Sequence, residues 1–303
     1  MKKSILFAFM VLAASVCLYG RDLNVASYNV RQMNDRDYRH DDGWDQRKDI
    51  LCDLIRFNDF DAVGLQEPFK KQLDDILERL PQYDYVGVAR DDGKEKGEYS
   101  AVLYNKERFK LLKSGTFWLS ETPDVPGKGW DAACVRVCSY AKLKDRKCGK
   151  VFWFFNTHLD HIGVVARREG CKLILAKIEE IAGPRANIVV TGDFNVDQFS
   201  EPYQTILSTG TLKDCLYATD VKFIPGGTFN NFSVERYTIS HIDHIFVSAT
   251  AQVKRFGVLT YHYWENASRG EAKLDDAPLE ISAQQRQAHN PSDHYPIMAT
   301  VRF

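Results

Sequence analysis

Residues 188–197 read IVVTGDFNVD, and this stretch decides the fold of the chain. Its first four residues are apolar or β-branched, which is typical of a buried β-strand. A glycine then interrupts the strand, and Asp193 and Asn195 follow with one residue between them. Side chains two residues apart in extended backbone point the same way. The stretch therefore predicts a rigid strand that holds two polar side chains at its carboxyl end.

Polar residues also lie at the ends of five other expected strands. Each stands beside residues that should be buried, where a polar group needs a partner. Taken singly, each has an ordinary explanation as a turn, a helix cap or a hydrogen-bonded core residue. These residues are Asn29 in the strand 22–30, Glu67 after 61–66, Asn156 and His158 in 151–158, Asp243 in 241–248, and Asp293 and His294 before 296–303.

Taken together, these residues predict one site. At least four carboxylates would converge there, and acids packed this closely repel one another unless a cation relieves the repulsion. Oxygen ligands without a cluster of cysteines favour a hard cation over zinc. We therefore expect Mg²⁺ or Mn²⁺, as one ion or two.

The remaining pattern indicates an α/β protein with roughly a dozen strands and few helices. Residues 151–158 are apolar on both faces, so this strand should be central. Residues 99–105 and 109–118 are expected to pair as a hairpin. Two mixed sheets packed face to face, with helices outside, would satisfy this count. The expected helices span 45–57, 70–80, 165–182 and 203–207.

The first 20 of the 303 residues resemble a secretory signal peptide. They read MKKSILFAFMVLAASVCLYG, with two lysines, an apolar run and small residues. We expect an exported protein, periplasmic or secreted, with residues 21–303 as a single domain. An uncleaved anchor is the alternative, and a lipoprotein at Cys17 is less favoured because Val16 precedes it. The formal net charge of −1 gives no overall basic surplus for tight, non-specific nucleic-acid binding.

Six short blocks, in order along the chain, resemble the signature of the endonuclease/exonuclease/phosphatase superfamily, and they span residues 22–303. The resemblance implies a deoxyribonuclease-like, four-layer α/β/β/α sandwich that holds one or two divalent metal ions and hydrolyses a phosphate ester. The blocks are Tyr28-Asn29-Val30, Leu65-Gln66-Glu67, Asn156-Thr157-His158-Leu159, Gly192-Asp193-Phe194-Asn195, Ile242-Asp243-His244-Ile245-Phe246 and Ser292-Asp293-His294-Tyr295-Pro296.

The resemblance also implies roles for the metal ligands and the nucleophile. Glu67 would bind the metal, with Asn29 beside it and Asp293 contributing. Asp193 would orient and deprotonate the attacking water, and Asn195 would bind the phosphate or hold the nucleophile.

The two histidines would contact the phosphate. As an imidazolium, either His158 or His294 could stabilise the pentacovalent state or protonate the leaving oxygen. Asp243 would orient His294 and raise its pKa. Some abasic-site nucleases carry an acidic metal ligand two residues after the strand-end asparagine. Here that residue is Arg31, so a second metal ion is in doubt.

Substrate recognition is inferred from residue type and position alone. Each candidate has an alternative role in packing or in a salt bridge. The candidates are Arg31 and Arg167 as phosphate clamps, Tyr99 and His241 as side chains that face the site, and Trp118, Trp130 and Phe229 as surfaces for stacking on a base or sugar.

The leading hypothesis is an exported, metal-dependent phosphodiesterase or nuclease in which Asp193 activates water for direct attack. A second is a phosphomonoesterase acting on a sugar, inositol or lipid phosphate. A third is a non-catalytic binding module, which the complete set of site residues disfavours. The expected partner is a phosphate ester: nucleic acid, nucleotide, sugar phosphate or phospholipid head group. No protein partner is indicated, and a monomer is expected.

Overall fold

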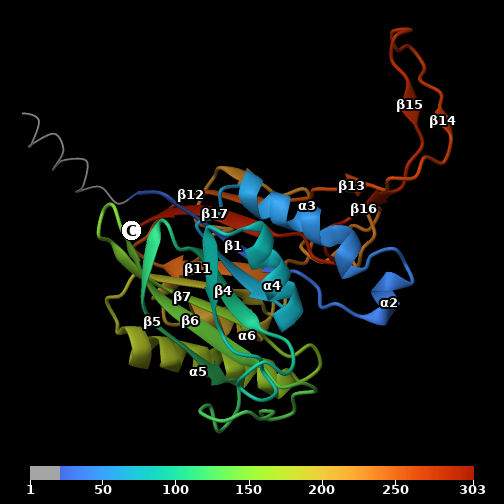
Figure 1. The fold of residues 1–303 in the computed structure, drawn as a ribbon. Helices are drawn as coiled ribbons and strands as arrows, with labels where there is room; N and C mark the ends of the chain where they lie inside the picture. The colour runs from blue at the N-terminus through green and yellow to red at the C-terminus, as the bar shows by residue number, and fades with distance from the viewer. Residues whose placement is uncertain (1–20) are drawn as a thin grey trace, which may run out of the picture.

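Two β-sheets form the centre of the molecule (Figure 1). The computed structural model describes residues 21–303, and the expected signal peptide lies outside the described residues. In spatial order, the first sheet contains β10 (Lys222–Phe223), β12 (Gln252–Val258), β17 (Ile297–Arg302), β1 (Leu23–Asn29), β2 (Ala62–Gln66), β4 (Ser100–Asn105) and β3 (Tyr83–Val86). The second contains β5 (Phe109–Trp118), β6 (Val137–Asp145), β7 (Val151–His158), β8 (Ile188–Asp193), β11 (Asp243–Ser248) and β9 (Leu212–Asp214).

Three hydrophobic clusters separate four layers, as the sequence predicts. Val25 of β1 and Phe154 of β7 belong to the cluster between the two sheets. Leu51 and Leu65 belong to a second cluster, between the first sheet and its helices. Ile174 belongs to a third cluster, between the second sheet and its helices. The helices are α2 (Asp35–Tyr38), α3 (Trp44–Phe57), α4 (Lys70–Arg79), α5 (Val164–Ala182) and α6 (Glu201–Leu207). The α/β/β/α sandwich is therefore confirmed.

The hairpin expected from residues 99–105 and 109–118 is wrong. β4 pairs with β2 and β3 in the first sheet, whereas β5 pairs with β6 in the second. Residues of β4 are buried on both faces, so this strand lies inside a sheet. Most residues of β5 are at least partly exposed, and β5 forms a sheet edge. The short connection therefore carries the chain from one sheet to the other.

Strand β7 is central, as expected, because it lies between β6 and β8 and has seven of its eight residues buried. Its Asn156 links the two sheets. The side-chain amide of Asn156 donates to the carbonyl oxygens of Leu65 (2.9 Å) and Ala101 (2.8 Å) across the sandwich. The Asn156 Oδ1 accepts from Gln66 (2.7 Å) and Thr191 (3.0 Å). This asparagine therefore fixes the distance between the layers and lies beneath the site.

A long hairpin projects from the body (Figure 1). At its base β13 (Tyr263–Trp264) pairs with β16 (Ala288–His289), and farther out β14 (Glu271–Ala272) pairs with β15 (Ala283–Gln284). Within residues 21–303, no helix combines the length and apolar composition needed to cross a membrane. The six cysteines of this described part are all free.

Candidate active site

Strand register brings three predicted site residues of the second sheet side by side. β7 and β8 are parallel, and His158 is the register partner of Asp193. β11 is antiparallel to β8, and its first residue, Asp243, is also a partner of Asp193. All three side chains are buried. The carboxyl ends of two parallel strands thus share one sheet edge with the start of a third.

The first sheet contributes Asn29 and Glu67 from the ends of parallel strands β1 and β2. The Asn29 Nδ2 donates both to Glu67 Oε1 (3.0 Å) and to Asp193 Oδ2 (3.0 Å). This one amide therefore joins the two sheets at the site. Glu67 has a φ of 71°, in the left-handed region, and its other oxygen accepts from the Gln32 amide (3.1 Å). Such a conformation is uncommon outside glycine and indicates a position held by its surroundings.

Asn195 holds the nucleophile side of the site in place. Its backbone N–H donates to Asp193 Oδ1 (2.9 Å), and its φ of 49° turns the chain sharply after β8. The Asn195 Nδ2 lies 3.1 Å from His158 Nε2 and donates to the Leu159 carbonyl (3.0 Å). The two polar residues of the GDFN stretch therefore lie against the same histidine, although Asn195 reaches it from the turn after β8 and not from extended backbone.

The two histidines occupy opposite electrostatic environments. His294 Nδ1 lies 2.9 Å from Asp243 Oδ2, and its Nε2 lies 3.6 Å from Asp193 Oδ2. Burial opposes the charged ring, but Asp243 and Asp193 outweigh it and raise the pKa of His294 to about 10. Burial, with Arg136 and Arg90 nearby, lowers the pKa of His158 well below its usual value. At neutral pH the site thus contains one imidazolium and one neutral imidazole.

The buried acids carry an electrostatic cost that a cation would relieve. Burial, with repulsion from Asp243, raises the pKa of Asp193 to about 7, against the opposing effect of His294. Burial and then Glu67 raise the pKa of Asp293, again opposed by His294. The Oδ1 of Asp243 is buried without a hydrogen-bond partner among residues 21–303. These oxygen donors are the type that hard divalent cations prefer.

Two groups of donors in the site could hold a cation. Ligand atoms of Asp193, Asp243 and His294 lie within 4.8 Å of one another. The imidazolium of His294 offsets one of the two carboxylate charges in this group, and a protonated ring cannot bind a metal. Glu67 is the better candidate ligand because its side chain is only partly buried and it lies close enough to Asp293 to raise the pKa of that carboxyl. Glu67 and Asp293 thus form the second group of donors, and their carboxylates fit one hard divalent ion.

Arg31 lies against the acids rather than free in the cleft. Its Nε donates to Asp37 Oδ2 (2.8 Å), and its Nη1 lies 3.3 Å from Asp293 Oδ2. Although burial opposes it, the carboxylates of Asp37, Asp293 and Glu67 raise the pKa of Arg31 above its usual value. A permanent positive charge therefore stands where a second acidic ligand would be needed, and this disfavours a second ion there.

Four other candidates for substrate contact make hydrogen bonds within the protein. Trp118 is 6% exposed and donates through Nε1 to the Arg90 carbonyl (2.7 Å), so it supports that loop. The Tyr99 hydroxyl donates to the Lys94 carbonyl (3.0 Å), and its ring is buried. Arg167 Nη1 donates to the Asp160 carbonyl (3.0 Å). The buried His241 N–H donates to Gln198 (3.0 Å). None of these four bonds involves a predicted catalytic or metal-binding residue.

Phe229, a candidate stacking residue, lies at the site. It forms an isolated β-bridge with His294, and its ring meets the imidazole edge-to-face at 5.0 Å between centroids. Trp130 is partly buried, and its N–H donates to Glu121 (3.2 Å). Phe229 therefore packs against the ring of His294.

Arg47 supports the site and was not predicted to. It is fully buried in α3, and its guanidinium donates to the carbonyl oxygens of Val30, Arg31 (2.7 Å), Asp42 (3.0 Å) and Pro291 (3.2 Å). Three of these carbonyls, on Val30, Arg31 and Pro291, belong to the loops that carry the site residues Asn29 and Asp293. An arginine on the buried side of an amphipathic helix was the available signal, since such a charge needs partners.

A second unpredicted group lies beside His158. Glu98 pairs with Arg90 (2.6 Å), and both line a small hollow with Arg136 and His158. Burial and the nearby Glu67 raise the pKa of Glu98 to about 7, opposed by the two arginines. The Arg90 Nε and Arg136 Nη1 are buried without a partner among residues 21–303. Two guanidinium groups with unpaired N–H donors therefore lie buried beside this histidine.

A sandwich of this kind, with acids, amides and two histidines at one edge, defines a class of hydrolases acting on phosphate esters. The endonuclease/exonuclease/phosphatase family model matches residues 26–294, and the chain belongs to this family. A family member from Bacteroides thetaiotaomicron is 44% identical, with a TM-score of 0.86 over 94% of this chain and 98% of that one.

A mannosyl-6-phosphatase from the same organism is 45% identical, with a TM-score of 0.85 over 93% of this chain and all of the other. The TDP2 protein of D. rerio, solved with a single-strand DNA product, is 18% identical with a TM-score of 0.63, over 93% of this chain and 99% of that chain. At that identity the likeness is one of fold alone.

Proposed function

We propose that this chain is a divalent-metal-dependent phosphomonoesterase that acts on a sugar phosphate. The observation that carries the proposal is the 45% identity to the mannosyl-6-phosphatase over 93% of the chain. The phosphodiesterase or nuclease hypothesis has support from the shared fold only, since the DNA-bound relative is 18% identical.

In the proposed reaction a water oxygen attacks phosphorus, and the bond from phosphorus to the sugar oxygen breaks. Asp193 is placed to orient the water and accept its proton, because Asn29 and Asn195 fix its two oxygens. His294 is the charged donor that faces the developing negative charge, and Asp243 holds its ring. The imidazolium either stabilises the pentacovalent phosphorus or gives its proton to the leaving oxygen.

Glu67, with Asn29 and Asp293 beside it, would hold one Mg²⁺ or Mn²⁺. A bound divalent ion supplies charge stabilisation for the phosphoryl oxygens. Arg31 keeps the neighbouring acids paired through Asp37 and Asp293. Neutral His158, held by Asn195, would accept or donate a hydrogen bond at the phosphate.

Export, a single domain over residues 21–303 and a monomeric state remain parts of the proposal that follow from the sequence. The leader of residues 1–20 supports export to the periplasm or the medium. Mass measurement of the mature chain would locate the cleavage site, and light scattering would give the oligomeric state.

The test is release of phosphate from mannose 6-phosphate, other sugar phosphates, DNA and bis-(p-nitrophenyl) phosphate, with Mg²⁺, Mn²⁺ or a chelator. We expect metal-dependent hydrolysis of a hexose monoester and much slower cleavage of the diesters. Asp193→Asn should abolish it, whereas Lys172→Gln on the surface of α5 should not. Faster hydrolysis of a diester than of the sugar monoester would contradict the proposed substrate class. Full activity of the Asp193→Asn variant would contradict the proposed active site.

A further inference from the structure

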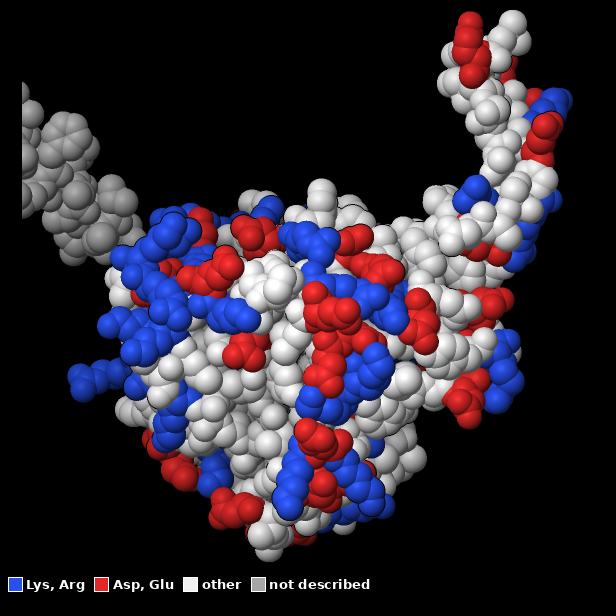
Figure 2. All heavy atoms as spheres, in the orientation of Figure 1, with Lys and Arg blue, Asp and Glu red and all other residues white. Residues whose placement is uncertain are grey.

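We propose that the end of the second sheet where β5 begins and β6 ends is a docking surface for an anionic lipid membrane, separate from the active site. The surface, named here the lysine face, consists of Lys106, Lys110, Lys113, Lys142, Lys144, Arg146, Lys147 and Lys150. Basic side chains gather on the left of Figure 2, where the ends of β5 and β6 lie in Figure 1.

The charge of this region differs sharply from that of the whole chain. Residues 106–117 and 138–151 contain nine Lys or Arg and two acids, a net charge of +7, whereas the chain has a formal net charge of −1. Of the two acids, Asp145 already pairs with Arg108 (3.1 Å). None of the eight cations of the lysine face forms a salt bridge with any residue in the range 21–303. The positive charge is therefore not neutralised within the described protein.

Lysines stand directly opposite lysines across the two strands. Lys110 is the register partner of Lys144, and Lys113 is the partner of Lys142. Like charges placed in this way destabilise a sheet. The Nζ atoms of Lys113 and Lys142 both lie over the Trp153 ring, at 5.9 and 5.1 Å from its centroid, which offsets part of that cost. The fold thus concentrates cations where its own stability would favour alternating charges.

The lysine face lies at the opposite end of the sandwich from the active site. β7 begins at Val151, beside Lys150, and ends seven residues later at His158. At about 3.3 Å per residue the two ends are about 23 Å apart. A surface bound at the lysine face would therefore leave the catalytic edge open to solvent. The lysine face is not positioned to bind the phosphate that the site hydrolyses.

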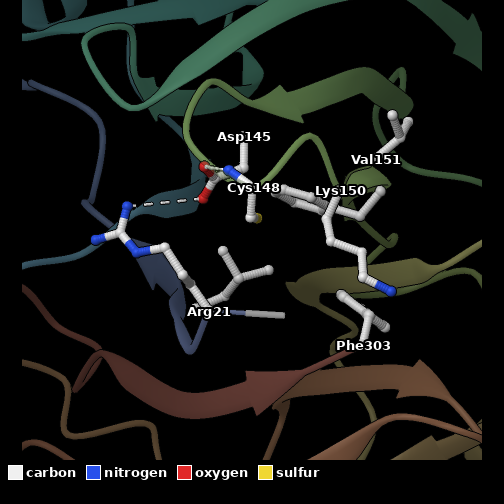
Figure 3. A pocket seen from close by; sticks show the side chains of 8 residues that line it. Arg21, Asp145, Cys148, Lys150, Val151 and Phe303 are labelled. Carbon is white, nitrogen blue, oxygen red and sulfur yellow. Dashed lines mark hydrogen bonds and ion pairs between the residues drawn. The ribbon is translucent and has the colours of Figure 1, made fainter. Parts of the chain in front are cut away.

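The first described residue lies at the same end. Arg21 is 3.9 Å from Asp145, and Figure 3 shows this pair beside a hollow that Cys148, Lys150 and Phe303 also line. The apolar leader of residues 1–20 precedes Arg21 directly in the sequence. The leader of the proposed export is therefore joined to the chain at the same end as the lysine face.

An exposed apolar side chain favours lipid over nucleic acid as the partner. Leu112 is 43% exposed and lies at a β-bulge between Lys110 and Lys113. A leucine flanked by lysines can enter the interface while the ammonium groups bind head-group phosphates. A polyanion such as DNA offers no apolar layer for Leu112. The geometry therefore points to a lipid bilayer with anionic head groups.

The test is co-sedimentation of a chain that starts at Arg21, which contains every element described above, with vesicles. Vesicles of phosphatidylcholine mixed with phosphatidylglycerol should bind it, and pure phosphatidylcholine should not. Each lysine near an anionic surface contributes about fivefold in affinity. The variant with Lys110, Lys113, Lys142 and Lys144 all changed to Gln should therefore bind more than about a hundredfold more weakly.

The matched control changes Lys48, Lys70, Lys71 and Lys172 to Gln, which alters the net charge equally at other surfaces. This control should keep its vesicle binding, and phosphatase activity should be unchanged in both variants. Leu112→Ser should weaken vesicle binding but leave binding to a single-stranded oligonucleotide unaltered. The proposal is overturned if anionic vesicles do not bind the chain, if the control loses as much affinity, or if the oligonucleotide binds more tightly than the vesicles.

Discussion

Changing Arg47 to Met should destabilise the protein and disturb the site together. Arg47 is fully buried, and its guanidinium donates to four carbonyl oxygens. Three of these, on Val30, Arg31 and Pro291, belong to the loops that hold Asn29 and Asp293. Methionine fills a similar volume but donates no hydrogen bond, so the four carbonyls would be left without this partner.

The expected loss of unfolding free energy follows from these contacts. A hydrogen bond from a charged donor contributes roughly 1.5 kcal/mol at the low end, so four lost bonds cost about 6 kcal/mol. The variant no longer has to desolvate a guanidinium, which offsets about 2 kcal/mol. A net loss of about 4 kcal/mol corresponds to a melting temperature lowered by about 10 °C for a chain of this size.

The assay combines thermal unfolding, followed by circular dichroism, with kcat/KM at a temperature where the variant is folded. Displacement of the site loops by about 1 Å should lower kcat/KM about a hundredfold. The matched control is Arg56→Met in the same helix, where the arginine side chain is 52% exposed. An equal effect of the two changes, or a drop of less than about 2 °C for Arg47→Met, would refute the reasoning.

Three further outcomes are expected. Asp243→Asn should lower kcat about a thousandfold with little change in KM, because His294 loses the carboxylate that orients and charges its ring. A loss of kcat under about tenfold in stopped-flow kinetics would argue against this pairing. Mg²⁺ at about 100 times its Kd should raise the unfolding free energy of the wild type by about 2.7 kcal/mol in calorimetry. The Glu67→Gln variant should not be stabilised by Mg²⁺. Equal stabilisation of the two proteins would exclude Glu67 as a ligand. Asn156→Ala should cost about 4 kcal/mol in urea unfolding, since four buried hydrogen bonds are lost. A cost below about 1 kcal/mol would show that water replaces the amide.

Much of the candidate site could be predicted because its residues lie at strand ends. A strand fixes the direction of the side chains beside it, so Asp193 and Asn195 were expected to act together from their spacing. The structure brings Asn29, Glu67 and His158 to the same edge. Residue type alone was a weaker guide: Trp118 suits substrate contact, but it is buried and donates to a backbone carbonyl of the 90–98 loop, whereas Tyr99 does line the hollow beside His158.

The amino-acid sequence by itself determined the class of fold, the order of its elements and the polar residues at their ends, because hydrophobic periodicity and turn residues act over short distances along the chain. Only the tertiary structure decided which strands share a sheet, so β4 and β5 separate although they are neighbours in sequence. It alone also placed Arg47 beneath the site loops and the lysine face at the far end of the sandwich. These features depend on contacts between distant residues, and no local pattern encodes such contacts.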